Sequence, residues 1–534
     1  MYIYPKITKD SLEKLLFSRF SSSGFLSLKD LPHPHQLKDM KSATDRIIRA
    51  IEHKEKIILI GDYDVDGVVS TTIMKLFFGE IGVDLDFIVP NRFRDGYGLS
   101  PTLIPRIRGY DLVITVDNGI SAVEASKMCQ EMGIDLIITD HHIVPSTVPE
   151  AYAIIDQKQD SCTFPYNEIC GAQIAWYLIA SINSSLGSKV DIKSYIELVA
   201  IAIVADMMPL LHINRAMVLS GLKLLSNSHR PSIRAFKEHL QKELFTGDDI
   251  GFQIAPILNS AGRLEDASLA VEFLMSPNIY ESRVLLEKLV DLNNSRKLIE
   301  QSITSEALNK VDSSDEVLVI SGDEWHEGVL GIVAARVSRE HSKPTIILTK
   351  NTQGELKGSG RSFGSCDLFD ITNSCREYLL KFGGHKAAIG LSLVEDNLEE
   401  FKRELSIRYS EKKYTNLEYD PDVVGRLNFD SITFELTDMI KKYEPFGQSN
   451  QKPKFMSRNV TILQVDRIGK DKEHLRFLFG DGGIILAGVK FKTNKSFLGG
   501  ESVDILYTIN ENHFRGDVSL QLLIFNINIS DNLL

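Results

Sequence analysis

The chain has 534 residues, of which 43% are hydrophobic and 25% charged, a composition typical of globular proteins that excludes a largely disordered or fibrous chain. This length exceeds a single hydrophobic core, so we expect two to four domains. The formal net charge of −12 disfavours attraction of the whole protein to nucleic acid or to an anionic membrane, although a local basic groove is compatible with it.

The N-terminal segment MYIYPKITKD lacks the basic and apolar regions of a signal peptide, and the most apolar long stretch, residues 198–211, is interrupted by Asp206. The five cysteines include no C-x-x-C pair, so their spacing gives no indication of a disulfide framework or of a structural zinc site. We therefore expect a cytoplasmic protein that makes no contact with a membrane.

Five β-rich runs alternate with helix-length segments in the first third of the chain. They cover residues 56–62, 84–90, 110–117, 135–140 and 151–156. Their nearly continuous Ile, Leu and Val are typical of strands that are buried on both faces. The alternation of strands and helices predicts an α/β fold with a parallel, doubly wound sheet.

The first of these runs leads into GDYDVDG, in which Asp62, Asp64 and Asp66 occupy alternate positions before a glycine. A calcium-binding EF-hand loop would need a glutamate where Ile73 stands and a helix in place of the preceding strand. In an extended chain, residues two apart point to the same side, so the three carboxylates could converge just beyond the strand. Such a cluster is costly unless a cation neutralises it or some carboxylates stay protonated.

Other strands of this sheet also end in acidic residues or histidines. Asp117 ends the third run, His141 and His142 follow the fourth, and Asp206 ends a later apolar run. Open parallel sheets bind ligands at the carboxyl ends of their strands. Aspartate and histidine are ligands for Mn²⁺ or Mg²⁺, and two such ions about 4 Å apart can clamp a phosphoryl transfer. A lone aspartate at such a place is more often a helix N-cap, but the joint occurrence of these residues at one edge favours a metal site.

Three further segments follow this sheet. Residues 265–312 are rich in Leu, Glu, Lys and Ala, and their later part predicts a long connecting helix. Residues 313–412 form a second α/β segment with the glycine-dense stretches GVLGIVAAR, KGSGRSFG and FGGHKAAIG. Residues 424–534 predict the short strands of a small β-barrel. Within this barrel segment, residues 451–500 hold ten Lys or Arg against four Asp or Glu, a local net charge of +6.

The order of these motifs resembles the DHH phosphoesterase superfamily, and specifically the RecJ-type single-strand exonucleases. Its four successive motifs are similar to GDYDVDG, TVDNG, TDHH and VADMMPL. The resemblance extends over nearly the whole chain through PNRFRDGYGLS, LNSAGRLEDASLAVEFL, WHEGVLGIVAAR, KGSGRS, FGGHKAAIG and YEPFGQSN. The domains that it implies are an N-terminal extension at residues 1–50, a parallel-sheet DHH catalytic domain at 51–264, a connecting helix at 265–312, a smaller α/β DHHA1 domain at 313–412 and a nucleic-acid-binding OB-type β-barrel at 424–534.

The resemblance also implies metal ligands and catalytic residues. The positions that match the family's ligands are Asp64, Asp66, Asp117, His141 and Asp206. Asp117 is expected to bridge two ions and so to be catalytic. Asp62 and His142 match motif positions that support the ligands or contact the scissile phosphate, so we add Asp62 to the metal site and His142 to the catalytic residues. Asp140 is expected to orient the motif, because an acid beside a ligating histidine can fix its tautomer.

A site for a strand with a 5′ phosphate is implied as well. The matching positions are Arg92, Ser359 and Arg361 for the phosphate, Arg263 for the strand backbone, and Gly383, Gly384 and His385 of the DHHA1 substrate motif. A guanidinium can bind phosphate through two parallel hydrogen bonds, and glycines allow close backbone approach. Taken singly, any of these arginines could instead be a surface residue in an ion pair.

The activity that the resemblance implies is that of a Mn²⁺- or Mg²⁺-dependent exonuclease with two bound ions. It would hydrolyse single-stranded DNA from 5′ to 3′ through metal-activated water and release 5′-mononucleotides during recombination and repair. Its expected partners are single-stranded DNA, a helicase and a single-strand-binding protein. A phosphodiesterase for short oligoribonucleotides or cyclic dinucleotides is an alternative that the terminal barrel and the connecting helix disfavour. An inactive DNA-binding scaffold is disfavoured because every ligand position is filled.

Overall fold

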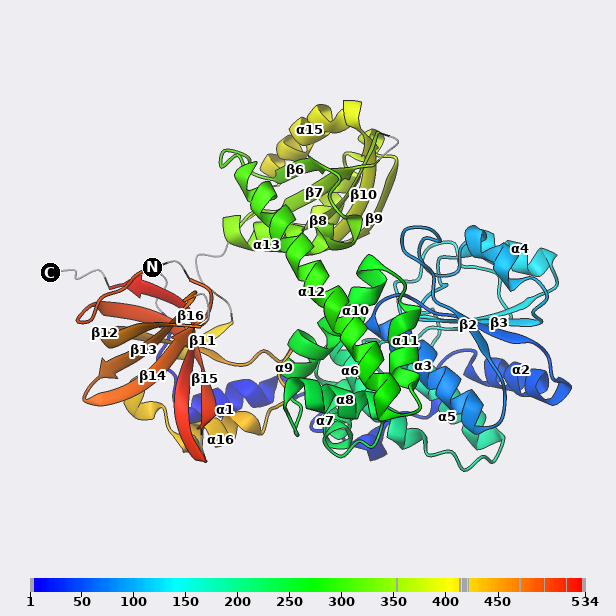
Figure 1. The fold of residues 1–534 in the computed structure, drawn as a ribbon, viewed down its shortest axis with the longest axis horizontal. Helices are drawn as coiled ribbons and strands as arrows, with labels where there is room; N and C mark the ends of the chain where they lie inside the picture. The colour runs from blue at the N-terminus through cyan, green and yellow to red at the C-terminus, as the bar shows by residue number, and fades with distance from the viewer. Residues whose placement is uncertain are drawn as a thin grey trace.

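The computed structural model describes residues 4–351, 354–412, 414, 420, 422–469, 472–493, 495–514 and 516–530. Figure 1 shows three bodies, each built around one β-sheet. They are the parallel-sheet domain (residues 40–264), the middle domain (residues 318–411) and the barrel domain (residues 423–530). Within the described ranges, no helix combines the length and the apolar character needed to cross a membrane.

The parallel-sheet domain confirms the predicted doubly wound α/β fold. Its strands are β1 (Ile57–Ile60), β2 (Asp86–Ile88), β3 (Leu112–Val116), β4 (Asp135–Thr139) and β5 (Ala153–Ile155), in the order β2-β1-β3-β4-β5. All neighbouring strands are parallel, and Ile60 pairs with Thr115 while Val116 pairs with Thr139. The residues that follow β1, β3 and β4 therefore leave the sheet at the same edge.

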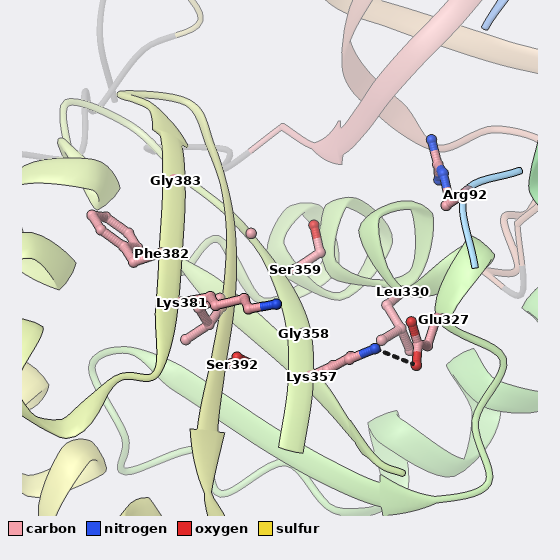
Figure 2. Close-up of a pocket in the computed structure, with 12 residues that line it drawn as sticks. Arg92, Glu327, Leu330, Lys357, Gly358, Ser359, Lys381, Phe382, Gly383 and Ser392 are labelled. Carbon is pink, nitrogen blue, oxygen red and sulfur yellow. Dashed lines mark ion pairs between the residues drawn. The ribbon is translucent and has the colours of Figure 1, made fainter. Parts of the chain in front are cut away.

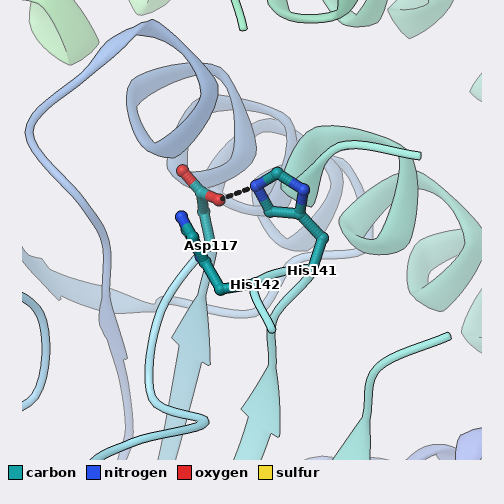
Figure 3. A group of neighbouring side chains, drawn as sticks. All are labelled: Asp117, His141 and His142. Carbon is teal, nitrogen blue, oxygen red and sulfur yellow. Dashed lines mark ion pairs between the residues drawn. The ribbon is translucent and has the colours of Figure 1, made fainter. Parts of the chain in front are cut away.

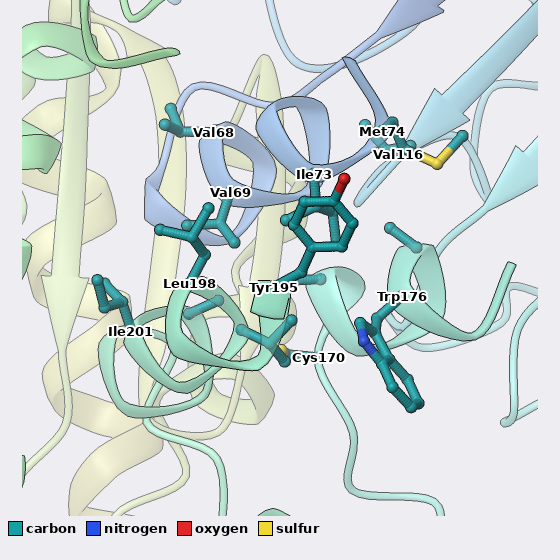
Figure 4. Close-up of a cluster of buried hydrophobic side chains, with 14 of the residues drawn as sticks. Val68, Val69, Ile73, Met74, Val116, Cys170, Trp176, Tyr195, Leu198 and Ile201 are labelled. Carbon is teal, nitrogen blue, oxygen red and sulfur yellow. The ribbon is translucent and has the colours of Figure 1, made fainter. Parts of the chain in front are cut away.

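Both faces of this sheet are covered by helices, which explains the continuous apolar runs. The helices of the domain are α2 (Met40–His53), α3 (Val65–Glu80), α4 (Val123–Glu131), α5 (Gly171–Ser185), α6 (Ile196–Ala205), α7 (His212–Ser226), α8 (Pro231–Leu240), α9 (Gly247–Asp249) and α10 (Ala255–Leu264). Leu59 faces a core with α3, α5 and α6, whereas Ile58 faces the core beneath α4. Figure 4 shows Val69 and Ile73 of α3 packed near Leu198 of α6. This packing holds α3, which follows the GDYDVDG motif, inside the core.

A long helix joins the first two domains, as predicted. It is α12 (Ile279–Asn309), with 31 residues, and the shorter α11 (Ser268–Met275) precedes it. Pro277 lies in the break between the two helices, where its ring disfavours helical geometry at the preceding residue. The Asn278 side chain then caps α12 by accepting hydrogen bonds from two backbone N–H groups.

The middle and barrel domains each contain one further sheet. The middle domain has β6 (Leu318–Asp323), β7 (Thr345–Lys350), β8 (Glu355–Arg361), β9 (Lys381–His385) and β10 (Ala388–Val394), with α13 (Leu330–His341), α14 (Leu368–Asn373) and α15 (Leu398–Glu411). The barrel domain has β11 (Val423–Arg426), β12 (Lys454–Ile468), β13 (His474–Asp481), β14 (Ile484–Lys490), β15 (Ser502–Phe514) and β16 (Asp517–Ile529), with α16 (Phe434–Lys441). Pairing of β12 with β15 closes the five strands β12 to β16 into a barrel.

The N-terminal segment divides between two domains, although the prediction placed residues 1–50 with the parallel-sheet domain. Helix α1 (Lys9–Ser18) buries Leu12 and Leu16 in the core of the barrel domain, and Lys6 forms a backbone bridge with Arg426. Helix α2 packs on the parallel sheet, and the leucines of residues 26–37, between the two helices, also pack against the core of that domain. The spacing of Leu12 and Leu16 marks one apolar helix face, but it does not specify which domain that face covers.

Candidate metal centre and substrate cavity

The predicted metal ligands meet at the carboxyl ends of β1, β3 and β4 and at the end of α6. His141 Nε2 lies 3.2 Å from Asp117 Oδ1 and 3.6 Å from both Asp66 Oδ2 and Asp206 Oδ2. Figure 3 shows Asp117 and His141 pointing toward each other from neighbouring strand ends. The candidate ligand groups, whose atoms lie within 4.8 Å of one another, are Asp62–Asp64–Asp117, Asp66–His141–Asp206 and Asp117–His141–His142.

The start of α3 corrects the geometry expected for GDYDVDG. The helix begins at Val65, so Asp66 lies in its first turn rather than in an extended chain. Asp64 is the N-cap of α3, because its Oδ1 accepts hydrogen bonds from the backbone N–H groups of Asp66 (3.0 Å) and Gly67 (3.2 Å). Asp64 is thus both a capping residue and a candidate ligand. A Cβ on Gly67 would lie 2.6 Å from Asp62, so this glycine allows the close approach of the two segments.

The N-terminus of α5 forms a part of the site that the sequence analysis missed. Asp66 is buried and accepts hydrogen bonds from the backbone N–H groups of Gly171 (2.6 Å) and Ala172 (2.8 Å). The partial positive charge of a helix N-terminus suits this carboxylate. A Cβ on Gly171 would lie 2.6 Å from Asp117 Cβ, so α5 also presses directly on a second candidate ligand.

Three carboxylates of this cluster each have a buried oxygen atom without a hydrogen bond from the described part of the chain that would compensate for its burial. Asp62 Oδ1, Asp117 Oδ1 and Asp206 Oδ2 accept no hydrogen bond from the residues described. Burial and the charge of Asp64 raise the pKa of Asp66 to about 6, and burial and the charge of Asp66 raise the pKa of Asp206 to about 9. Such a group of acids is stable as carboxylates only beside a cation. These oxygen atoms and the imidazole of His141 fit a Mn²⁺ or Mg²⁺ ion.

The backbone of Asp117 and the ionisation of His141 fit the same interpretation. Asp117 has φ +63°, a left-handed conformation that is uncommon for residues other than glycine and that concentrates at functional sites. Burial and the charge of His142 lower the pKa of His141 to about 3, so its imidazole is neutral at neutral pH. A neutral imidazole is the form that binds a metal.

Asp140 orients the histidine motif by contacting His142 rather than the ring of His141. Its Oδ1 accepts hydrogen bonds from His142 Nδ1 (2.7 Å) and from the backbone N–H of His141 (2.8 Å), and its Oδ2 accepts one from Ile120 N (2.8 Å). Burial opposes a charge on His142, but the hydrogen bond to Asp140 and the charge of that residue raise the pKa of His142 to about 9. His142 is therefore a cation at the rim of the carboxylate cluster.

Tyr97 is a second site residue that the sequence analysis did not single out. Its hydroxyl donates to the backbone carbonyl of Asp117 at 3.4 Å and lies 3.5 Å from His142 Nε2. Its ring meets those of Tyr63 and His142 edge to face. The segment PNRFRDGYGLS carried the resemblance, but nothing in its composition distinguishes this tyrosine from a core aromatic.

A cavity of about 350 Å³ brings Arg92 of the parallel-sheet domain to the middle domain. Its polar and charged lining includes Arg92, Glu327, Lys357, Ser359 and Lys381, together with the backbone of Gly383, as Figure 2 shows. Arg361 Nη1 donates to Ser359 Oγ at 3.0 Å, which ties this arginine to the cavity wall. The arrangement suits an anion such as a phosphate, because three cationic side chains face this space against one carboxylate, that of Glu327, which lies 3.5 Å from Lys357 Nζ.

The other predicted substrate residues lie outside the wall of this cavity. Arg263 Nη1 donates to the carbonyl of Gly328 at 3.2 Å and so joins the parallel-sheet and middle domains. Burial and the charge of Arg92 lower the pKa of Arg263 to about 10, which leaves it cationic at neutral pH. Gly384 and His385 belong to β9. A Cβ on Gly384, whose φ is +139°, would lie 2.3 Å from the carbonyl oxygen of residue 388, so the pairing of β9 with β10 itself requires this glycine.

A parallel sheet that ends in this aspartate and histidine cluster, joined by a long helix to a smaller α/β domain, defines a member of the DHH family. Family models match in three places: the DHH family N-terminal domain at residues 56–203, the DHHA1 domain at 314–411 and the RecJ OB domain at 424–526.

Relatives extend this match along the chain. The single-stranded-DNA-specific exonuclease RecJ of Haemophilus influenzae is 33% identical over 93% of this chain and 92% of its own length. That of Escherichia coli is 33% identical over 97% and 96%. The crystal structure of RecJ from Thermus thermophilus in complex with Mn²⁺ has a TM-score of 0.81 at 25% identity and covers 93% of this chain and 72% of that one. The chain belongs to the RecJ family of single-stranded-DNA-specific exonucleases.

Proposed function

We propose that the chain is a divalent-metal-dependent exonuclease that removes nucleotides from the 5′ end of single-stranded DNA, releases 5′-mononucleotides and acts in recombination and repair. The observation that carries this proposal is the meeting of aspartate and histidine side chains at one sheet edge, with buried carboxylate oxygens that accept no hydrogen bond from any residue in the described ranges. Family membership supports the choice of substrate, because the names of the relatives state it.

Two ions are expected to bind, with Asp117 between them. This assignment is supported by the 3.2 Å distance from Asp117 Oδ1 to His141 Nε2, which links the group Asp62–Asp64–Asp117 to the group Asp66–His141–Asp206. The RecJ protein of Thermus thermophilus has been crystallised with Mn²⁺ and with Mg²⁺, and oxygen and imidazole ligands suit both ions. When bound, the ions would activate water and neutralise the negative charge that develops on the phosphodiester.

The chain's own residues then bind and orient the strand. His142, a cation beside the cluster, is placed to donate a hydrogen bond to the scissile phosphate. Arg92, Ser359 and Arg361 would hold the 5′ phosphate in or beside the cavity that joins the two domains. The separation between this cavity and the metal centre would decide how many nucleotides leave in each cut.

The test is digestion of 5′-labelled single-stranded DNA, duplex DNA and RNA with Mn²⁺, with Mg²⁺ and with EDTA. We expect a labelled mononucleotide as the first product from single-stranded DNA, and only when a metal is present. If the label stayed on long fragments, digestion would proceed from the 3′ end, opposite to the proposed direction. A strict preference for a dinucleotide over a long strand would favour the oligoribonucleotide phosphodiesterase instead.

The Asp117→Ala variant tests the metal assignment. Loss of the shared ligand should lower the cleavage rate by more than about 100-fold, the upper end of the effect of groups that only support a ligand. Strand binding, measured by fluorescence anisotropy in EDTA, should be retained because the arginines are unchanged. Wild-type cleavage by this variant would contradict the two-metal assignment.

We also propose a cytoplasmic location and delivery of the strand by a helicase and a single-strand-binding protein. All five cysteines are free thiols, which supports a reducing compartment. Pull-down of the intact chain with each class of partner, with and without single-stranded DNA, tests the second part. Failure of both partners to bind would contradict it.

A further inference from the structure

The loop that follows Asp206 is held by the barrel domain. Asp206 is the C-cap of α6, and its Oδ2 accepts no hydrogen bond within the described structure. Asp64 and Asp66 differ in this respect, since backbone N–H groups bind both of their side chains. The backbone N–H of Asp206 donates to the carbonyl of Ala202 at 2.9 Å, so α6 holds its main chain on one side, and the loop of residues 206–211 that leads to α7 borders it on the other.

One turn of the barrel domain contacts this loop directly. We call residues 442–450 the barrel turn. The backbone N–H of Leu210 donates to the carbonyl of Gln448 at 2.9 Å, and a Cβ on Gly447 would lie 2.7 Å from Leu210 Cδ1. Leu210 is buried in the core of the parallel-sheet domain, whereas Leu211 packs against the core of the barrel domain. The loop is thus clamped between two hydrophobic cores, four residues after the candidate ligand.

Arg215 fastens the same turn from the first part of α7. Its Nη2 donates to the carbonyls of Lys442 (3.0 Å) and Glu444 (2.7 Å), and its guanidinium lies 4.6 Å from the centre of the Phe25 ring. The side chain is buried, with 8% of the residue exposed. Two hydrogen bonds from a buried guanidinium to backbone carbonyls fix one geometry between α7 and the turn.

The turn has its own internal support. Asn450 is fully buried, and its Nδ2 donates to the carbonyls of Tyr443 (2.8 Å) and Pro445 (2.9 Å). Its Oδ1 accepts a hydrogen bond from Arg19 Nη1 at 3.1 Å, just beyond helix α1. The turn is therefore a rigid contact surface rather than a passive linker before β12.

We propose that Arg215 and the barrel turn position Asp206 for metal binding, so that docking of the barrel domain sets the affinity of the metal centre. This inference rests on the proposed metal-dependent function. Arg215 is a positioning residue, since its hydrogen bonds go to the backbone of the barrel turn and its guanidinium packs on Phe25. The barrel domain then contributes to catalysis without supplying a ligand, in addition to any contact that it makes with the strand.

The test is Mn²⁺ binding to the full chain, monitored by electron paramagnetic resonance of the free ion. Arg215→Met keeps an apolar side chain beside Phe25 but cannot donate to the carbonyls of Lys442 and Glu444. We expect it to weaken Mn²⁺ binding by about tenfold, as is typical of groups that orient a metal ligand. Arg215→Lys keeps a donor and should recover part of the affinity. Strand binding in EDTA should not change.

The matched control is Arg458→Met, which removes a barrel arginine that bonds Asp504 rather than the turn. It should bind Mn²⁺ as the wild type does. If Arg215→Met does not fold, Gly447→Ala should weaken Mn²⁺ binding, and the double variant with Leu210→Val, which removes the opposing methyl group, should restore it. If folded Arg215→Met bound Mn²⁺ with wild-type affinity, the inference would be overturned while the proposed function would stand. The same conclusion would follow from wild-type affinity in Gly447→Ala, if Arg215→Met could not be measured. A wild-type chain that binds no Mn²⁺ would overturn the proposed function with it.

Discussion

At the scale of single residues, the metal centre depends on neighbours that carry no charge. Asp117 adopts a left-handed backbone conformation, and Gly171 at the start of α5 leaves the space that its side chain occupies. The backbone N–H of Gly171 also donates to Asp66. One glycine therefore places two candidate ligands, through its missing Cβ and through its N–H group.

We expect Gly171→Ala to weaken Mn²⁺ binding and to lower kcat by about 10- to 100-fold, the range for groups that orient metal ligands. The new methyl group would lie 2.6 Å from Asp117 Oδ1, so the carboxylate or the start of α5 must shift. Mn²⁺ titration and steady-state cleavage of single-stranded DNA measure the two effects.

The control for this change is Gly79→Ala in α3, where a Cβ would meet nothing within 4 Å. Alanine is favoured over glycine inside a helix, so this variant should keep wild-type metal affinity and stability or gain slightly in stability. Equal Mn²⁺ affinities for the two variants would show that the Gly171 contact does not place Asp117.

At the scale of elements, the strands were predictable and the contacts between distant elements were not. The apolar runs before Asp117 and His141 marked β3 and β4, and parallel topology then places both residues at one edge. Asp206 was a candidate because it ends an apolar run, but that run is a helix, so strand topology does not place this residue at the sheet edge. The hydrogen bonds from α5 to Asp66 span 105 and 106 residues, and no local pattern encodes them.

Strand β8 presents Ser359 and Arg361 two residues apart, and hence on one face. We expect Arg361→Gln to raise KM for 5′-phosphorylated strands by about 10- to 100-fold, since a hydrogen bond to a charged group contributes about 1.5–3 kcal/mol. Strands with a 5′ hydroxyl should be cleaved as by the wild type. Competition between the two strand types measures the difference.

Arg403→Gln is the matched control, because Arg403 lies in the same domain on α15 and pairs with Glu400 at the surface. It should leave the preference between the two strand types unchanged. If Arg361→Gln slowed the cleavage of both strand types equally, Arg361 would support the domain rather than bind the phosphate.

At the scale of the whole molecule, the order of the domains was predictable from the sequence, but the docking of all their segments was not. A small β-barrel was expected from turn signals between short strands, the resemblance implied its OB type, and β12 to β16 form the barrel. Helix α1 packs into this barrel more than 400 residues away along the chain, as the hydrogen bond from Tyr443 Oη to the carbonyl of Glu13 illustrates. An apolar helix face predicts that the helix is buried on that side, but it does not specify the domain against which the helix packs.

The separate cores of the domains predict how metal binding changes thermal unfolding. The candidate ligands all belong to the parallel-sheet domain, whereas the middle domain packs around its own clusters, one of which includes the end of α12. Mn²⁺ at about 100 times its Kd should stabilise the ligand-bearing domain by about 2.7 kcal/mol. For a domain of this size, we expect its calorimetric transition to rise by roughly 5–10 °C.

The transition of the middle domain should not move, and Asp117→Ala should abolish most of the shift, because the variant lacks the shared ligand. If the clamp between Leu210 and the barrel turn couples the two domains, the barrel transition will rise together with that of the parallel-sheet domain. In Arg215→Met the two transitions should separate, and only the ligand-bearing one should respond to Mn²⁺. A uniform rise of all transitions in wild type and Asp117→Ala alike would mean that the ion binds elsewhere.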